Sequence, residues 1–214
     1  MATASVADLT PVEHHHTSTG LDNKKIGIWA FIGSECLFFM SLISTYLIYK
    51  GRSIKGPFPH ETCGPPLCDV PRNAILNIPI TSASTFVLLM SSLFMVLAHS
   101  AVVRGDRKHS KLWLAGTAIA GTIFLGFQAY EFTSFVHEGL KLSTNLFGST
   151  FFTLTGFHGA HVTAGVIWLI TLLFIDIKRG LGPRDAINVD ICALYWHFVD
   201  VVWIAIFTLV YLIK

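Results

Sequence analysis

Apolar residues gather in five long runs along the chain, separated by shorter polar segments. The runs cover residues 26–49, 81–103, 112–136, 149–175 and 189–213, and each holds 23 to 27 residues with almost no charge. At about 1.5 Å per residue, a helix of this length crosses the roughly 30 Å hydrocarbon core of a bilayer. Lipid offers backbone groups no hydrogen-bond partner, and the runs are too long for barrel strands. The pattern therefore predicts an all-α integral membrane bundle of five transmembrane helices, spanning residues 26–214.

The first 25 residues form a polar tail. The tail shows neither an apolar core nor a small-residue cleavage site, so we expect neither a signal peptide nor a span there. Its consecutive histidines His14, His15 and His16 leave two interpretations open, a copper site and a solvated tail.

The longest polar connection covers residues 51–79 and holds six of the eight prolines. Such a composition favours a stiff, extended cover over a separate domain. Cys63 and Cys68 lie in this loop, and both a disulfide and two free thiols fit an outer, oxidising location. Although His60 is near, a zinc site needs more ligands than the loop offers.

Composition and charge fit a membrane protein. Of the 214 residues, 52% are apolar and only 13% are charged, and the formal net charge is +2. The basic residues occupy the segments between the runs, so they indicate how the chain is oriented in the membrane. We expect no nucleic-acid partner. Nine of the 15 fall on the side that holds the N-terminus and six on the other side. This difference predicts a cytoplasmic N-terminus and an outer C-terminus.

Small residues recur at helical spacing within two of the runs. Gly116 and Ala120 form one such pair, and Gly156, Ala160 and Ala164 follow one another at steps of four. Small side chains let helices approach closely in lipid. We therefore expect these faces to lie between packed helices.

Six ionisable side chains stand out inside the apolar runs. Each costs about 2.5 to 3.5 kcal/mol at bilayer depth on insertion scales, so each should face the protein interior and find a partner. The six are Glu35, Glu131, His158, His161, His197 and Asp200. Glu131 lies near the outer end of its run, and His99 lies near the inner end of another, where a polar group costs less.

Counting along the runs gives the expected depth of these groups. At about 1.5 Å per residue, Glu35, His197 and Asp200 lie roughly 13, 12 and 16 Å from the inner edge. His158 and His161 lie roughly 25 and 21 Å from the same edge. The count therefore predicts two levels of polar groups.

Spacing leaves the chemistry of these groups open. His197 and Asp200 are three residues apart, as are His158 and His161, so each pair shares a helix face. Imidazole and carboxylate pairs of this kind fit a metal or haem site, and they also fit a polar clamp between helices. Glu35 fits either proton handling or a neutral, hydrogen-bonded structural role.

Four segments together resemble one protein family. They are FIGSECLFF around Glu35, AHSAVVRGDRKH over 98–109, GSTFFTLTGFHGAHV over 148–162, and YWHFVDVVW over 195–203. The chain resembles subunit III of haem-copper terminal oxidases, the cytochrome c oxidase type, from about residue 25 to residue 214. Longer family members have seven helices; this chain has a polar tail in place of the first two and resembles the five-helix bacterial form, which implies a bacterial plasma membrane.

The resemblance implies an accessory subunit of aerobic respiration without a catalytic centre. Such a subunit binds no haem or copper, packs against catalytic subunit I in a complex that also includes subunit II, holds phospholipids, and supports proton uptake and the stability of subunit I. The family's carbodiimide-reactive carboxylate falls on Glu35. Its H-x-x-H motif falls on His158 and His161, and its W-H-F-V-D motif runs from Trp196 to Asp200.

Three other interpretations stay open at this point. A quinol oxidase or a nitric oxide reductase-associated relative would share the subunit type. A free-standing proton or solute transporter would use Glu35 and Glu131. A membrane metalloenzyme would use the histidines as ligands.

Overall fold

The structure is a computed structural model that describes residues 22–50, 52–53 and 76–213. Nearly all of the predicted polar tail and most of the proline-rich loop lie outside the described residues. The three tail histidines, His60, Cys63 and Cys68 also lie outside them, so the statements about these residues stay predictions.

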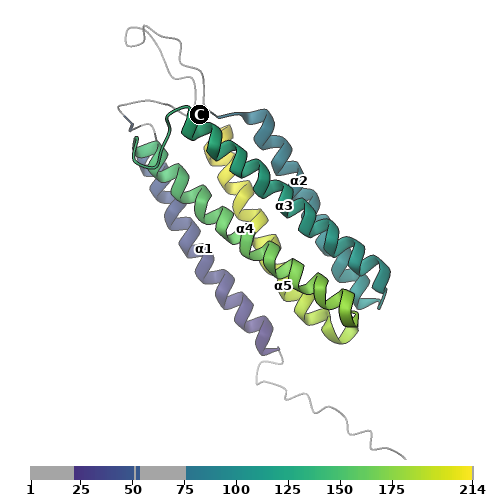
Figure 1. The fold of residues 1–214 in the computed structure, drawn as a ribbon. Helices are drawn as coiled ribbons and strands as arrows, with labels where there is room; N and C mark the ends of the chain where they lie inside the picture. The colour runs from purple at the N-terminus through teal and green to yellow at the C-terminus, as the bar shows by residue number, and fades with distance from the viewer. Residues whose placement is uncertain (1–21, 51, 54–75, 214) are drawn as a thin grey trace, which may run out of the picture.

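The described residues form five long α-helices and no strand, as Figure 1 shows. The helices are α1 (Asn23–Tyr49), α2 (Ile78–Val103), α3 (Arg107–His137), α4 (Leu146–Arg179) and α5 (Ala186–Phe207). A 3-10 turn, η1 (Pro183–Asp185), precedes α5, and a π-helical turn, η2 (Thr208–Leu212), extends it. All five are long and apolar enough to cross a membrane. The predicted all-α bundle of transmembrane helices is confirmed.

Four of the helices begin before the apolar runs because polar side chains cap their first turns. The Asp22 side chain accepts a hydrogen bond from the Lys24 backbone N–H at 2.8 Å, and Asn145 accepts one from Gly148 at 2.6 Å. Asp106 accepts two, from Lys108 and His109. Asn77 caps α2, and Pro79 follows within its first turn. Such caps satisfy donors that have no partner within the helix. The apolar run therefore underestimates the length of each of these four helices.

Three glycines with positive φ lie at the C-terminal ends of α2, α3 and α4. Gly105, Gly139 and Gly180 have φ of 73°, 87° and 74°, a left-handed conformation that L side chains rarely adopt. At Gly180 a Cβ atom would also lie 2.9 Å from Nε of Arg107. The turns are consequently tight, and consecutive helices run antiparallel along the bundle.

The helix α5 is the centre of the bundle and α1 lies at its edge. Eleven of the 22 residues of α5 are buried, against four of the 27 residues of α1. In Figure 1, α5 lies behind α4, and it packs against α1, α2 and α4. The helix α1 packs only against α4 and α5 among the described helices.

The indole of Trp196 fills the space between α3 and α4. A Cβ atom at Gly121 would lie 2.6 Å from this ring, and one at Gly165 would lie 2.8 Å from it. The predicted contact face at Gly156, Ala160 and Ala164 is wrong within the described part of the chain. Both alanines are exposed and nothing lies within 4 Å of a Cβ at Gly156, because spacing shows a shared face but not its direction.

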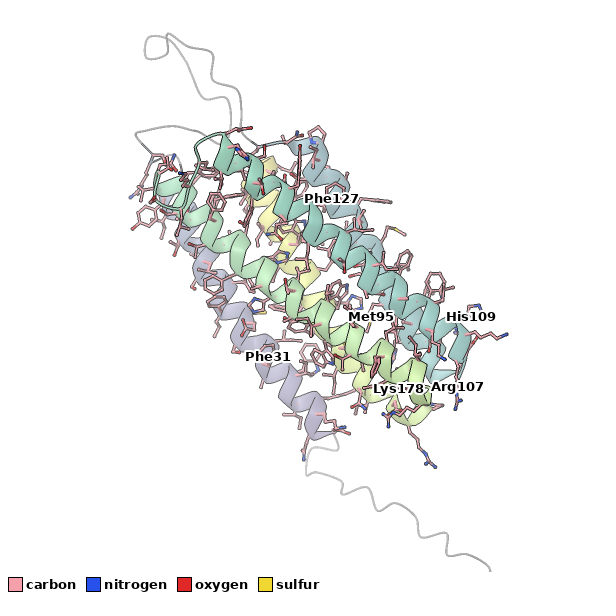
Figure 2. All side chains as sticks on the ribbon, in the orientation of Figure 1. Phe31, Met95, Arg107, His109, Phe127 and Lys178 are labelled. Carbon is pink, nitrogen blue, oxygen red and sulfur yellow. The ribbon has the colours of Figure 1, made fainter. Side chains whose placement is uncertain are left out.

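Basic residues gather at one end of the bundle. Figure 2 shows Arg107, His109 and Lys178 at the end where the α2–α3 and α4–α5 turns lie. The start of α1, with Lys24 and Lys25, lies at the same end. We name this the basic end, and the other the opposite end.

Candidate functional site

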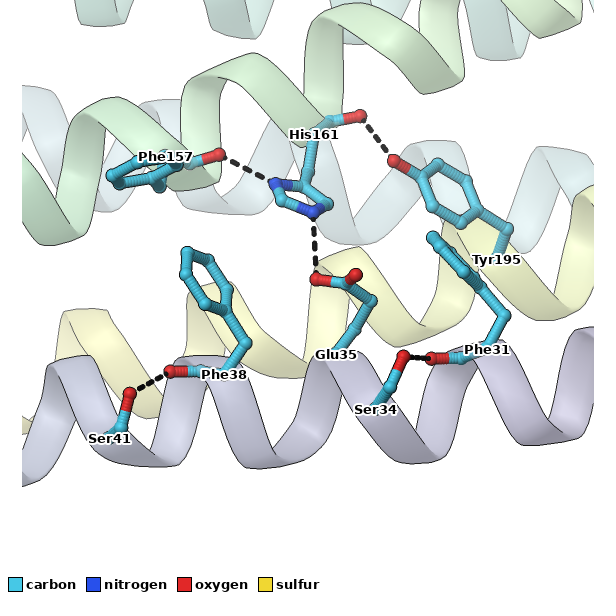
Figure 3. A network of polar contacts seen from close by, with 8 residues as sticks. All are labelled: Phe31, Ser34, Glu35, Phe38, Ser41, Phe157, His161 and Tyr195. Atoms are coloured by element: carbon cyan, nitrogen blue, oxygen red, sulfur yellow. Dashed lines mark hydrogen bonds and ion pairs between the residues drawn. The ribbon is translucent and has the colours of Figure 1, made fainter.

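A carboxylate and an imidazole meet between α1 and α4, inside the membrane span. Glu35 Oε2 lies 3.1 Å from His161 Nε2. Figure 3 draws this contact between the two side chains as a dashed line. The depth count placed His161 roughly 8 Å above Glu35. That offset is wrong, because α1 and α4 both extend beyond their apolar runs and the ends of the runs do not define a common level.

Hydrogen bonding fixes the number of protons in this pair. His161 Nδ1 lies 2.8 Å from the carbonyl oxygen of Phe157, which only accepts, so Nδ1 carries a proton. Nε2 then either accepts from a protonated Glu35 or donates to its carboxylate. Both arrangements place one proton between the two side chains and leave zero net charge. The geometry is therefore that of a hydrogen-bonded pair that carries no net charge in the membrane.

Aromatic rings shield the pair on one side. Phe39 packs its ring edge against the His161 ring at a centroid distance of 4.9 Å. Glu35 and His161 nevertheless keep 20% and 18% of their side-chain surface exposed. The Tyr195 hydroxyl donates to the His161 carbonyl oxygen at 2.9 Å, which brings α5 to the same place. The pair thus lies where three helices meet and stays reachable from the surface.

Two tryptophans tie α5 to α2. Trp196 Nε1 donates to Ser91 Oγ at 3.0 Å, and Trp203 Nε1 donates to Thr85 Oγ1 at 2.9 Å. Both indoles are almost fully buried, so each N–H needs a partner inside the protein. The hydroxyls of α2 supply these partners.

Asp200 adds a third tie between the same helices. Ser92 Oγ donates to Asp200 Oδ2 at 2.7 Å, while Asp200 Oδ1 has no hydrogen-bond partner among the described residues. His197 forms no hydrogen bond within this part of the chain and lies half-buried on the outer side of α5. Asp200 attracts His197 electrostatically, but of the two residues only Asp200 bonds to α2.

His158 lies apart from His161. Its ring is fully buried, stacks on Trp203 at 4.9 Å and meets Phe124 edge-on at 6.0 Å. Neither ring nitrogen has a hydrogen-bond partner among the described residues. The described residues also contain no group of three His, Cys, Asp or Glu side chains that could hold a metal ion. The two histidines of the H-x-x-H motif therefore lie in two different environments.

Glu131 and His99 lie at opposite ends of the bundle. Glu131 is buried and hydrogen-bonds to Thr81 of α2. It lines an open cavity of about 340 Å³ together with Asn77, Ser134 and other residues of α2 and α3. His99, at the basic end, has Nε2 4.0 Å from an Asp190 carboxylate oxygen.

Lysines hold both ends of α1 against α5. Lys25 Nζ lies 2.7 Å from Asp190 Oδ2 at the basic end. Lys50 Nζ donates to the carbonyl oxygen of Ile213 at 2.6 Å at the opposite end. Burial lowers the pKa of Lys50. Together with Glu35, these contacts attach a helix that has little apolar packing of its own.

Sequence reasoning missed Asp176. This fully buried carboxylate accepts hydrogen bonds from the Ser110 hydroxyl and from the Leu181 backbone N–H, the latter at 2.7 Å. It joins the start of α3 to the turn after α4. The apolar run ends at residue 175, so Asp176 was not among the ionisable residues selected inside the runs. Its place four residues before the turn glycine Gly180 was the available signal.

At the basic end outside the spans, Asp106 is the titrating cap of α3. Hydrogen bonds from the backbone and side chain of His109 hold the pKa of the Asp106 carboxyl below its usual range. The carboxylate also accepts from the Lys108 backbone N–H, so the charged form is the one that caps the helix.

These features define an integral membrane bundle whose buried polar groups join helices. The family model for cytochrome c oxidase subunit III matches residues 5–214. The chain therefore belongs to the cytochrome c oxidase subunit III family, as the resemblance predicted, and is a subunit III of haem-copper oxidases. Members of this family are subunits of multi-subunit oxidase complexes.

Curated relatives agree with this assignment. The chain is 41% identical over 190 residues to cytochrome c oxidase subunit 3 of Bacillus sp. strain PS3, covering 89% of this chain and 86% of the relative. It is 39% identical over 187 residues to quinol oxidase subunit 3 of Bacillus subtilis, with 87% and 85% covered. It is 34% identical over 200 residues to the cytochrome bo(3) ubiquinol oxidase subunit 3 of Pseudomonas aeruginosa, with 94% and 88% covered.

Proposed function

We propose that the chain is the non-catalytic accessory subunit of a proton-pumping oxygen reductase. It packs against catalytic subunit I, in a complex with subunit II and other members, and haem and copper are held by those partner subunits. Membership of the subunit III family carries the proposal. The described residues support it, because His158 is enclosed by aromatic rings and His161 is engaged with Glu35.

The Glu35–His161 pair supports proton uptake in this proposal. It holds one exchangeable proton at zero net charge, and both side chains keep part of their surface exposed. Release of this proton leaves the pair with one negative charge, which lipid disfavours, so release is coupled to the uptake of a replacement proton. The other buried polar groups, Asp200, Glu131 and Trp196, stabilise the bundle and so the surface that it offers to subunit I.

Phospholipids are the second proposed ligand. An apolar groove of about 490 Å³ lies between α3 and α4, and its lining includes Ala118 and Thr122 of α3 and Ile170 and Leu173 of α4. A neighbouring groove of about 500 Å³ lies at Ile80, Ile123, Gly126, Phe127 and Tyr130. Both are open and apolar, which suits acyl chains.

The proposed location is a bacterial plasma membrane, with the basic end and the N-terminus in the cytoplasm and the C-terminus outside. The concentration of Lys and Arg at the basic end supports this orientation. The relatives described above are all bacterial. Their names include both cytochrome c and quinol oxidases, so either electron donor is compatible with this chain.

Purification of the tagged chain from native membranes in mild detergent tests the proposal. We expect a larger subunit to accompany it, with a reduced-minus-oxidised haem spectrum and copper in the same fraction. Stripping the partner should remove both. A chain that purifies alone without metal would favour a transporter, and one that purifies alone with stoichiometric metal would favour a metalloenzyme.

A further inference from the structure

One face of α5 is left uncovered by the other described helices. It follows Leu194, His197, Val201 and Ile204, which are spaced three and four residues apart and so lie in one row. Val201 is 62% exposed and Ile204 is 42% exposed. Because α5 packs against α1, α2 and α4, this row, which we name the α5 row, faces the open side between α1 and α2.

His197 makes this row different from an ordinary lipid-facing surface. It lies in the middle of the span, is half-buried, and has no hydrogen bond within the described chain. Of the ionisable side chains at this depth, Glu35 and His161 satisfy one another. Asp200 is bonded to Ser92 and attracts His197 electrostatically, but it forms no hydrogen bond with His197. Acyl chains offer no hydrogen bond, and lipid headgroups do not reach mid-membrane, so lipid would leave His197 unsatisfied.

We propose that the α5 row is the docking surface for a spanning helix of the haem-bearing subunit. That helix presents a hydrogen-bonding side chain to His197, and its apolar residues pack against Val201 and Ile204. The imidazole then fixes the register of the two helices, since every other position of the row accepts any apolar contact. A helix is the required form because lipid-exposed backbone must satisfy its own hydrogen bonds. The inference rests on the proposed function, which supplies the partner.

Photo-crosslinking in the assembled complex tests which face docks. A photo-crosslinking amino acid at Val201 should capture the haem-bearing subunit, identified by mass spectrometry. The same amino acid at Ile170 of α4, which is 51% exposed in the α3–α4 groove, is the matched control and should capture lipid. Capture of the haem-bearing subunit from position 170 and not from position 201 would overturn the proposal, and so would capture of lipid alone from position 201.

Substitution of His197 tests the proposed hydrogen bond. His197→Leu should lower the haem retained by the tagged chain in mild detergent about tenfold, the effect of losing one or two hydrogen bonds in a membrane. His197→Gln keeps a donor and an acceptor and should retain haem to within about twofold, as should Val201→Leu. Far-ultraviolet circular dichroism of each variant monitors the fold.

The outcomes separate this inference from the proposed function. Wild-type chain that purifies without any haem subunit contradicts both. Wild-type chain that carries haem, together with a His197→Leu variant that is folded and retains haem equally well, contradicts only the docking surface. Equal losses in His197→Leu and His197→Gln would contradict the hydrogen bond.

Discussion

Two replacements of Glu35 should separate its contribution to stability from its role in holding a transferable proton. Glu35→Leu removes both the hydrogen bond and the exchangeable proton. Glu35→Gln keeps a side-chain amide that donates to Nε2 of His161, but it holds no transferable proton. We therefore expect the leucine variant to lose stability and the glutamine variant to retain most of it.

The magnitude follows from the position of the pair. Interhelical hydrogen bonds in membranes contribute about 0.6 kcal/mol on average and about 1–2 kcal/mol in model helices. The Glu35–His161 distance of 3.1 Å is that of an ordinary hydrogen bond, and about a fifth of each side chain is exposed, so we expect a coupling free energy of about 1 kcal/mol. Glu35→Leu also leaves Nε2 without a partner, which brings its total cost to about 1–2 kcal/mol. For a chain of this size that lowers Tm by roughly 2–8 °C.

The assay is a double-mutant cycle with Glu35→Leu, His161→Leu and the double variant. The free energy of unfolding is measured in lipid bicelles by steric trapping. We expect a coupling free energy of about 1 kcal/mol, and a loss below about 0.5 kcal/mol for Glu35→Gln. A coupling free energy of zero, or a glutamine variant as unstable as the leucine variant, would refute the reasoning.

Three further predictions concern other positions. Trp203→Phe should cost about 2 kcal/mol of unfolding free energy through the lost bond to Thr85 and the smaller ring, and a double-mutant cycle with Thr85→Val should show coupling. His158→Phe keeps the stacked ring and removes two unpartnered nitrogens, so unfolding free energy should be unchanged or higher; a loss above about 1 kcal/mol would reveal a partner for the imidazole. Asp106 has a folded-state pKa below its ordinary value of 3.8, so its cap stabilises α3 fully above that value and weakens as the pH falls through the lowered pKa. The protection factors of amides 107–111, which are corrected for the intrinsic pH dependence of exchange, should fall in that acid window. Protection factors that respond to pH no more than those of Asp106→Asn would contradict the assignment.

The fold could be predicted because lipid imposes one strong constraint on the sequence. Five runs of spanning length with almost no charge allow only helices, and the structure has them. The ends were less predictable, since capping residues such as Asp22 and Asn145 are polar and lie outside the runs. The small-residue face at Gly156 was assigned wrongly because spacing defines a row on a helix but does not show what covers it.

The candidate site was predictable as a set of residues but not as a set of contacts. The free-energy cost of placing an ionisable side chain in lipid identified Glu35, His161 and Asp200 individually as candidates. Their partners depend on helix rotation and offset, which the sequence does not encode locally, so the bond between Glu35 and His161 was not foreseen. Hydroxyl partners such as Ser92 cost little in lipid, so the sequence did not identify them as candidates.

Proton uptake by the assembled oxidase with Glu35→Gln in this subunit tests the proposed role most directly. The variant complex is compared with wild type at equal haem content, with the presence of the subunit checked in both. The account predicts that the variant keeps the subunit, because the tie to His161 survives, and that proton uptake during turnover is slower. Proton uptake at the wild-type rate in a variant complex that retains the subunit would contradict it.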